Sequence, residues 1–196
     1  MGSLPEARIL GGVGSILVIL APIPFFPLST ALSLAGFVLV LIAVKFISDE
    51  LRDRSIFINM LIAAVLTILG LILAGILLIG VLAQLPFLEG FLQPLIPLPR
   101  FTESAVLNLI IGLILALVTV AAAYTASAVF LRRSFRSIAS GLNVEMFNTA
   151  AFIYVIGSRL VWVFFAGFVL IIVAQILQVL AFFSLPDRPP ATSESP

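Results

Sequence analysis

Two positively charged side chains stand beside long uncharged stretches, where an ionisable group is a candidate for function. Arg159 follows the uncharged residues 146–158 and precedes the uncharged residues 160–185. A charge at membrane depth is costly and commonly serves the passage of ions or substrates, so Arg159 is the candidate intramembrane functional charge. If the helix breaks near Gly157, Arg159 instead lies at the lipid headgroups as an anchor. Lys45 is close to a polar segment, and its long side chain can extend to the membrane surface.

Within the bilayer, Arg159 would need a polar partner to offset the cost of burying its charge. The candidates are Glu145 and the face of the last hydrophobic stretch that carries Gln175 and Gln178. The two glutamines are three residues apart and therefore share one face of a helix. We expect these amides to hydrogen-bond a neighbouring helix rather than to bind a substrate, because such bonds commonly join membrane helices.

The remaining polar residues do not form the groupings that catalysis or metal binding requires. The chain has no His and no Cys, which excludes Ser-His and Cys-His catalytic pairs and thiolate metal sites. The uncharged stretches contain no pair of carboxylates and no phosphate-binding loop. We therefore predict no catalytic residues, no cofactor, no metal ion and no nucleic-acid partner, and we expect the protein not to be an enzyme.

The composition identifies the solvent that surrounds this protein. Of 196 residues, 62% are hydrophobic, and only 10 Lys+Arg and 9 Asp+Glu carry charge. A soluble domain has about 25% charged residues, because its surface must be solvated. The 10% found here, with a mean hydropathy of +1.32, predicts an integral membrane protein.

The uncharged stretches predict the helices. A membrane-spanning helix needs about 20 residues to cross about 30 Å of hydrocarbon, so residues 56–83, 105–131 and 160–185 each predict one span. Residues 9–44 are also uncharged, but three prolines between 22 and 27 interrupt helical hydrogen bonding there. This stretch therefore predicts a helical hairpin.

We predict an all-α fold, a polytopic integral membrane helical bundle of about five hydrophobic helices with interfacial amphipathic segments. It forms a single transmembrane domain over residues 1–185, followed by a disordered tail over residues 186–196. The expected helices are 5–21, 28–47, 56–83, 105–131 and 159–185, and the expected interfacial segments are 86–99 and 132–146.

Residues 132–146 have the most regular polar pattern in the chain. One helical face carries Phe135, Ile138, Ala139 and Leu142, and the opposite face carries Arg132, Arg133 and Arg136. This pattern predicts a basic amphipathic helix that continues the preceding span and lies on the inner leaflet. We expect the three arginines to contact lipid headgroups. A regulatory lipid site and a docking face for a partner are the alternatives.

Residues 146–158 are too short to cross a membrane as a full span. A single helix over 146–185 would be about 60 Å long, so the chain must break near Gly157. If residues 146–158 stay at the interface, one span follows and the C-terminus lies outside, which is the outcome we favour. If they make a thin crossing, the C-terminus returns inside.

Positive charges predict the orientation. With a hairpin followed by three spans, most of the Lys and Arg residues lie on one side, and only Arg100 and Arg188 lie on the other. The positive side of a membrane protein is cytoplasmic, so we expect a cell-membrane protein with a cytoplasmic N-terminus. The residues on the cytoplasmic side are Arg8, Lys45, Arg52, Arg54, Arg132, Arg133 and Arg136.

The polar segment 48–55 joins two of these helices. Helical spacing predicts ion pairs between Glu50 and Arg54 and between Asp49 and Arg52. Ser55 is the expected N-cap of the following helix. We interpret the segment as a solvated turn, with a cation or partner site as the alternative.

Small residues four apart predict close helix packing, which in lipid replaces the hydrophobic drive to association. The predicted packing residues are Gly70 with Ala74 and Gly112 with Ala116. Two short segments also recur: residues 14–18 resemble residues 157–161, and residues 35–39 are identical to residues 166–170. These echoes indicate either an internal duplication, as in many transporters, or chance in a chain of few residue types.

Short motifs occur along most of the chain. Those in the first half are Leu10–Ser15, the turn at Pro22, Gly36, Asp49 and Arg54–Phe57; those in the second half are Ser134-Phe135, Ile138-Ala139, Val144, Phe147, Thr149-Ala150, Tyr154–Gly157 and Ala181–Pro186. With these motifs the chain resembles the small archaeal membrane proteins of domain of unknown function 996. The resemblance implies a multi-pass archaeal membrane protein with no assigned activity, so it supplies no catalytic residues.

These patterns favour a non-enzymatic multi-pass membrane protein with a structural or assembly role. Its partners would be membrane lipids and either further copies of itself or a larger membrane complex. The alternative is a small transporter or channel that uses Arg159. An enzyme that acts on lipid is the third hypothesis.

Overall fold

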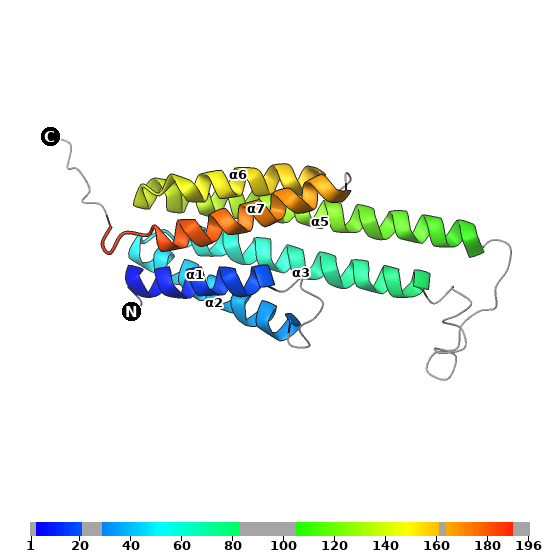
Figure 1. Ribbon diagram of the computed structural model, residues 1–196, viewed down its shortest axis with the longest axis horizontal. Coiled ribbons are helices and arrows are strands. Elements are labelled where there is room, and N and C mark those ends of the chain that lie inside the picture. The colour runs from blue at the N-terminus through cyan, green and yellow to red at the C-terminus, as the bar shows by residue number, and fades with distance from the viewer. Residues whose placement is uncertain (1–2, 21–28, 83–104, 161–163, 190–196) are drawn as a thin grey trace. The chain divides into compact units, whose positions relative to one another are not determined.

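The computed structural model describes residues 3–20, 29–82, 105–160 and 164–189, and within these ranges it contains helices and no strand (Figure 1). This confirms the predicted all-α class. The expected turn at 22–27, the expected interfacial segment 86–99 and the tail beyond residue 189 lie outside the described residues. The helices are α1 (Leu4–Leu20), α2 (Ser29–Glu50), α3 (Arg54–Leu82), α5 (Ala105–Leu142), α6 (Glu145–Arg159) and α7 (Phe164–Phe183).

Three of these helices are long and apolar enough to cross a membrane, by length and composition. They are α2 from Ala31 to Glu50, α3 from Arg54 to Val81 and α5 from Leu107 to Leu142. In α7 the apolar part, Val169–Phe183, is shorter. The finding agrees with the composition, which predicts long apolar helices that satisfy their own backbone hydrogen bonds.

The chain divides into two compact units. The larger unit contains residues 1–64 and 127–196, and the smaller contains residues 65–126. The larger unit therefore holds α1, α2, α6 and α7, the first part of α3 and the last part of α5. In this unit α1 packs along α2 and α7, and α6 packs along α7.

An aromatic cluster lies in the core of the larger unit. Phe147 of α6 contacts Phe135 of α5 edge-on, with ring centroids 5.3 Å apart, and Phe182 of α7 edge-on at 5.1 Å. All three rings are fully buried. Edge-to-face pairs add about 0.5–1.5 kcal/mol to packing, so this cluster fixes three helices against one another.

Buried serines join α5 to α3 in the same unit. The Ser134 hydroxyl donates to the Ile56 carbonyl at 2.8 Å, and the Ser127 hydroxyl donates to the Ala63 carbonyl at 2.9 Å. Both hydroxyls reach across to the backbone of the neighbouring helix, where an unsatisfied polar group would be costly.

The helix α5 runs without a break to Leu142, as expected of a helix that continues the preceding span. It differs from the expected surface helix at 132–146 in its apolar face, because Phe135, Ile138 and Leu142 are buried in the core of the larger unit. The face that we expected on the inner leaflet is thus covered by other helices. An amphipathic pattern shows that one face is covered, but it does not distinguish lipid from protein as the cover.

The C-terminal end follows the segment 146–158, whose position relative to the membrane stays a prediction. Residues 145–159 form α6, and the Arg8 guanidinium lies 3.1 Å from the Asp187 carboxylate. The start of α1 and the end of α7 therefore meet at the same end of the larger unit (Figure 1). The prediction from the lengths of the uncharged stretches counted only helices that cross the whole membrane. In the structure the short helix α6 packs along α7, and the chain changes direction between the two helices.

Candidate functional site at the charged end

Charged residues collect at one end of the larger unit, which we call the charged end. There the start of α1, the α2–α3 turn, the α5–α6 turn and the end of α7 lie together (Figure 1). This grouping adds Asp187 and Arg188 to the charges expected on one side. The charged end comprises Glu6, Arg8, Lys45, Asp49, Glu50, Arg52, Asp53, Arg54, Arg132, Arg133, Arg136, Glu145, Asp187 and Arg188.

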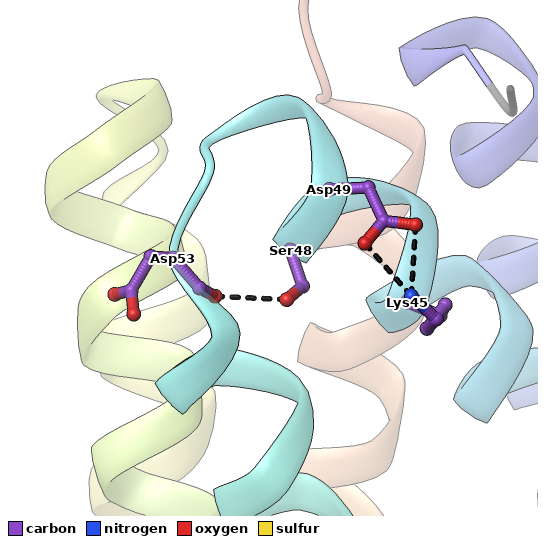
Figure 2. Close-up of polar contacts among 4 residues, drawn as sticks. All are labelled: Lys45, Ser48, Asp49 and Asp53. Carbon is purple, nitrogen blue, oxygen red and sulfur yellow. Dashed lines mark hydrogen bonds and ion pairs between the residues drawn. The ribbon is translucent and has the colours of Figure 1, made fainter.

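Figure 2 shows the polar contacts of the α2–α3 turn. The buried Ser48 hydroxyl donates to the Asp53 carbonyl at 2.8 Å, which closes the turn from within. The Lys45 ammonium lies 2.8 and 2.9 Å from the two oxygens of Asp49, one helical turn away. Both groups of this ion pair are about half exposed, so the pair contributes little to stability.

This turn does not contain the ion pairs that helical spacing predicts, and its cap differs. Asp49 pairs with Lys45 rather than with Arg52. Asp53, not Ser55, caps α3, because its carboxylate accepts the Ser55 N–H at 2.9 Å. The reason is that α2 ends at Glu50 and Arg52 has a φ of 52°, so helical spacing does not continue across the turn.

The three arginines that we predicted to contact headgroups lie on the exposed face of α5, within the charged end. Arg132 lies over the ring of Phe152 in α6, 5.7 Å from its centroid, and Arg133 lies over Phe130 at 5.5 Å. Within residues 3–20, 29–82, 105–160 and 164–189, none of the three forms an ion pair with a carboxylate. Their N–H groups are therefore available to an external anion.

Sequence reasoning did not identify Phe152 as part of this group. The relevant signal was the short link between α5 and α6, which sets the two helices antiparallel. Residues before and after such a link can therefore meet across the two helices. Arg132 meets Phe152 in this way, and Phe135 meets Phe147.

Arg159 is the exposed last residue of α6, at the opposite end of that helix from the charged end. Glu145 begins the same helix, about 21 Å away at 1.5 Å per residue, so it cannot be the partner. Gln178 donates instead to the Ser15 hydroxyl of α1 at 3.0 Å. This bond confirms that Gln178 joins a neighbouring helix, and it leaves Arg159 without that predicted partner.

The predicted packing residues lie in the smaller unit. A Cβ added to Gly70 of α3 would collide with Ala123 of α5, and one added to Gly112 of α5 would collide with Val81 of α3. Ala74 and Ala116 are also buried. These small residues therefore face the neighbouring helix of the same chain.

The segments that resemble each other in sequence make matching contacts in the larger unit. A Cβ on Gly14 of α1 would lie 2.6 Å from the Gly36 carbonyl of α2. A Cβ on Gly157 of α6 would lie 3.1 Å from the Gly167 carbonyl of α7. In both pairs the backbone nitrogen four residues after the second glycine is also among the three nearest atoms, at 3.0 and 3.1 Å. The two hairpins thus cross in the same way, which supports an internal duplication.

In the part of the chain that the structure describes, no group of three or more acidic, His or Cys residues is placed to hold a metal ion. The charged end offers exposed cations, two ion pairs and capped turns. This chemistry suits the recognition of anions at a surface.

The profile of a family described as a protein of unknown function (DUF996) matches residues 32–176. The chain is also similar to an uncharacterized protein of Methanocaldococcus jannaschii, with 32% identity over 186 residues that cover 94% of each chain. No solved structure matches this chain.

Proposed function

The chain belongs to the DUF996 family, and we propose on this premise that it is a multi-pass protein of the cell membrane with a structural or assembly role. In this proposal it associates with further copies of itself or with a larger membrane complex, and it is not an enzyme. The resemblance to an archaeal relative of similar length supports an archaeal origin. The N-terminus and the charged end face the cytoplasm.

The observation that carries this proposal is the exposed apolar surface of the smaller unit. Its two helix segments pack on each other through small residues and leave their large side chains uncovered. A contiguous apolar surface of this kind marks contact with lipid or with other proteins. The side chains at least 40% exposed are Val65, Ile68, Leu69, Leu71, Ile72, Leu73, Ile76, Leu78 and Ile79 of α3, and Leu107, Ile110, Ile111, Leu113, Ile114, Leu115 and Val118 of α5.

The larger unit supports membrane insertion as well. On α1 the exposed residues Ile9, Val13, Ile16 and Leu20 form one stripe, and on α7 Val169, Val173, Ile176 and Leu180 form another. Each stripe lies on one face of its helix, because the residues are spaced by four, three and four. These exposed apolar stripes fit a helical bundle that is surrounded by lipid. The basic residues of the charged end would then lie at the cytoplasmic headgroups.

The proposal is tested in two steps. Membranes from cells that express the full chain are washed with alkaline carbonate, and we expect the protein to stay in the membrane fraction. The protein is then extracted in mild detergent, and its mass is measured by light scattering after subtraction of the detergent. We expect a mass above that of the 21.0 kDa chain, either as an oligomer or with co-isolated partners. A strictly monomeric species that co-isolates nothing contradicts the assembly role.

A small transporter or channel is the second candidate, and the matching glycine crossings favour it because duplicated halves are common in transporters. In this case Arg159 would carry function. Flux of candidate ions is measured in liposomes that contain the wild type or Arg159→Ala. If Arg159→Ala leaves the flux unchanged, Arg159 has no role in transport.

A further inference from the structure

We propose that Arg132 and Arg136, with Phe152, bind the phosphate headgroup of an anionic lipid where α5 passes α6. The inference rests on the proposed membrane location and names a ligand for one part of the charged end. Arg132 and Arg136 are both exposed and are four residues apart on α5, so they lie on one face about one turn apart. Two guanidinium groups at that spacing can bind one phosphate from two sides.

The ring of Phe152 positions the first arginine. The Arg132 guanidinium lies 5.7 Å from the ring centroid, within the range of a cation–π contact. A contact with the ring uses no N–H···O hydrogen bond, so the donors of the guanidinium that do not face the ring stay available to an acceptor. Those donors match the paired oxygens of a phosphate, so the side chain is pre-organised for an anion.

The charge of this pair is available, in contrast to other cations of the charged end. Arg8 is paired with Asp187, and Lys45 is paired with Asp49. Arg132 and Arg136 have no carboxylate within ion-pair distance among the residues that the structure describes. A phosphate would therefore bind without displacing an internal partner.

The surroundings favour a lipid over a free anion. Phe152 is 50% exposed, and Val129, three residues before Arg132 and farther from the charged end, is 40% exposed. Both offer apolar surface next to the arginines. A lipid whose phosphate contacts Arg132 and Arg136 can place its chains along this surface, whereas inorganic phosphate gains nothing from it.

The test uses the full chain, purified in a neutral detergent, and follows its apparent Tm. Three probes are added separately: dioleoylphosphatidylglycerol, dioleoylphosphatidylcholine and inorganic phosphate. We expect the phosphatidylglycerol to raise the Tm in a saturable manner, and the other two probes to give little or no shift. In the variant with Arg132→Gln and Arg136→Gln, we expect the concentration for half the shift to rise by roughly tenfold or more, since each Arg near an anionic surface contributes about 1 kcal/mol.

A matched control removes two other exposed arginines of the charged end, by Arg54→Gln and Arg188→Gln. We expect this control to retain the lipid response. We expect Phe152→Leu, which keeps an apolar side chain but removes the ring, to weaken the response while the Tm without lipid stays close to that of the wild type.

Three outcomes overturn the inference. An equal response to inorganic phosphate would indicate an anion site without lipid preference. An equal loss in the control would indicate non-specific attraction. No rise in the Tm of the wild type with phosphatidylglycerol would show that the site does not bind this lipid. Each of these results leaves the membrane location intact, which the carbonate wash tests separately.

Discussion

Arg52 and Asn143 are the residues with a positive φ in the described part of the chain, at 52° and 56°. Each ends a helix, α2 or α5, and allows the next helix to begin within a few residues. The Asp53 N–H donates to the Ser48 carbonyl at 3.1 Å, and the Val144 N–H donates to the Ala139 carbonyl at 3.2 Å. These bonds to a carbonyl five residues earlier are typical of a helix that ends in a left-handed residue, a position that glycine usually occupies.

We therefore expect Arg52→Gly to stabilise the protein. The left-handed conformation costs an L-residue about 1–2 kcal/mol, and the flexibility of glycine when unfolded returns part of that, so the net gain is about 0.5–1 kcal/mol. The measurement is thermal unfolding in detergent. The control is Arg52→Ala, which removes the charge but keeps the Cβ, and we expect no gain from it. Equal gains in both variants would mean that the charge, not the backbone, is unfavourable.

A substitution of Ser48 tests whether its hydrogen bond stabilises the α2–α3 turn. We expect Ser48→Ala to lower the free energy of unfolding by about 1 kcal/mol, because a buried bond to the Asp53 carbonyl is lost. Ser140 is the matched control, since its hydroxyl also donates to a backbone carbonyl, that of Ser137 at 3.1 Å, but it is exposed. Chemical denaturation in detergent compares the two variants. A loss from Ser140→Ala as large as that from Ser48→Ala would contradict a special role for the buried bond.

At the scale of elements, the hairpins α1–α2 and α6–α7 depend on glycines that bring two backbones together. We expect Gly14→Ala to be strongly destabilising, because the new Cβ would lie 2.6 Å from the Gly36 carbonyl, and backbone cannot move aside cheaply. We expect Gly157→Ala to cost less, since its contacts are at 3.1 Å. Gly75→Ala is the control and should be neutral or stabilising by up to about 1 kcal/mol, because nothing lies within 4 Å of its Cβ and alanine favours a helix interior over glycine.

Thermal unfolding of these three variants ranks the contacts. If Gly14→Ala and Gly75→Ala behave alike, the close crossing of α1 and α2 is not needed for stability. We expect Gly157→Ala to lower the stability as Gly14→Ala does, but by less. This result would support the interpretation of the two hairpins as copies of one unit.

At the scale of the whole molecule, the larger unit predicts that both ends of the described chain face the same side of the membrane. The chain has no Cys, so single Ser→Cys variants at the exposed positions 3, 140 and 184 are conservative probes. We expect a membrane-impermeant maleimide to label all three from the same side, the cytoplasmic one. Labelling of position 184 from the side opposite to position 3 would restore the five-span arrangement with an outside C-terminus.

The candidate site was predictable in part. Period-3.6 spacing placed Arg132, Arg133 and Arg136 opposite the apolar face of the same helix, and the structure has them exposed. The partner of Arg132 was not predictable, because Phe152 belongs to another helix and the pairing depends on how the two helices meet. The same holds for Arg8 and Asp187, which lie at opposite ends of the chain.

Composition and the lengths of the uncharged stretches were enough to establish that the chain is helical and suited to lipid, because each helix must satisfy its own backbone within about 20 apolar residues. These are local properties, so the amino-acid sequence alone determines them. What covers each apolar face, where α6 turns back and which charges meet at one end depend on contacts between distant segments. Only the packed molecule decides them, since leucine-rich faces look alike in sequence whether lipid or a neighbouring helix lies against them.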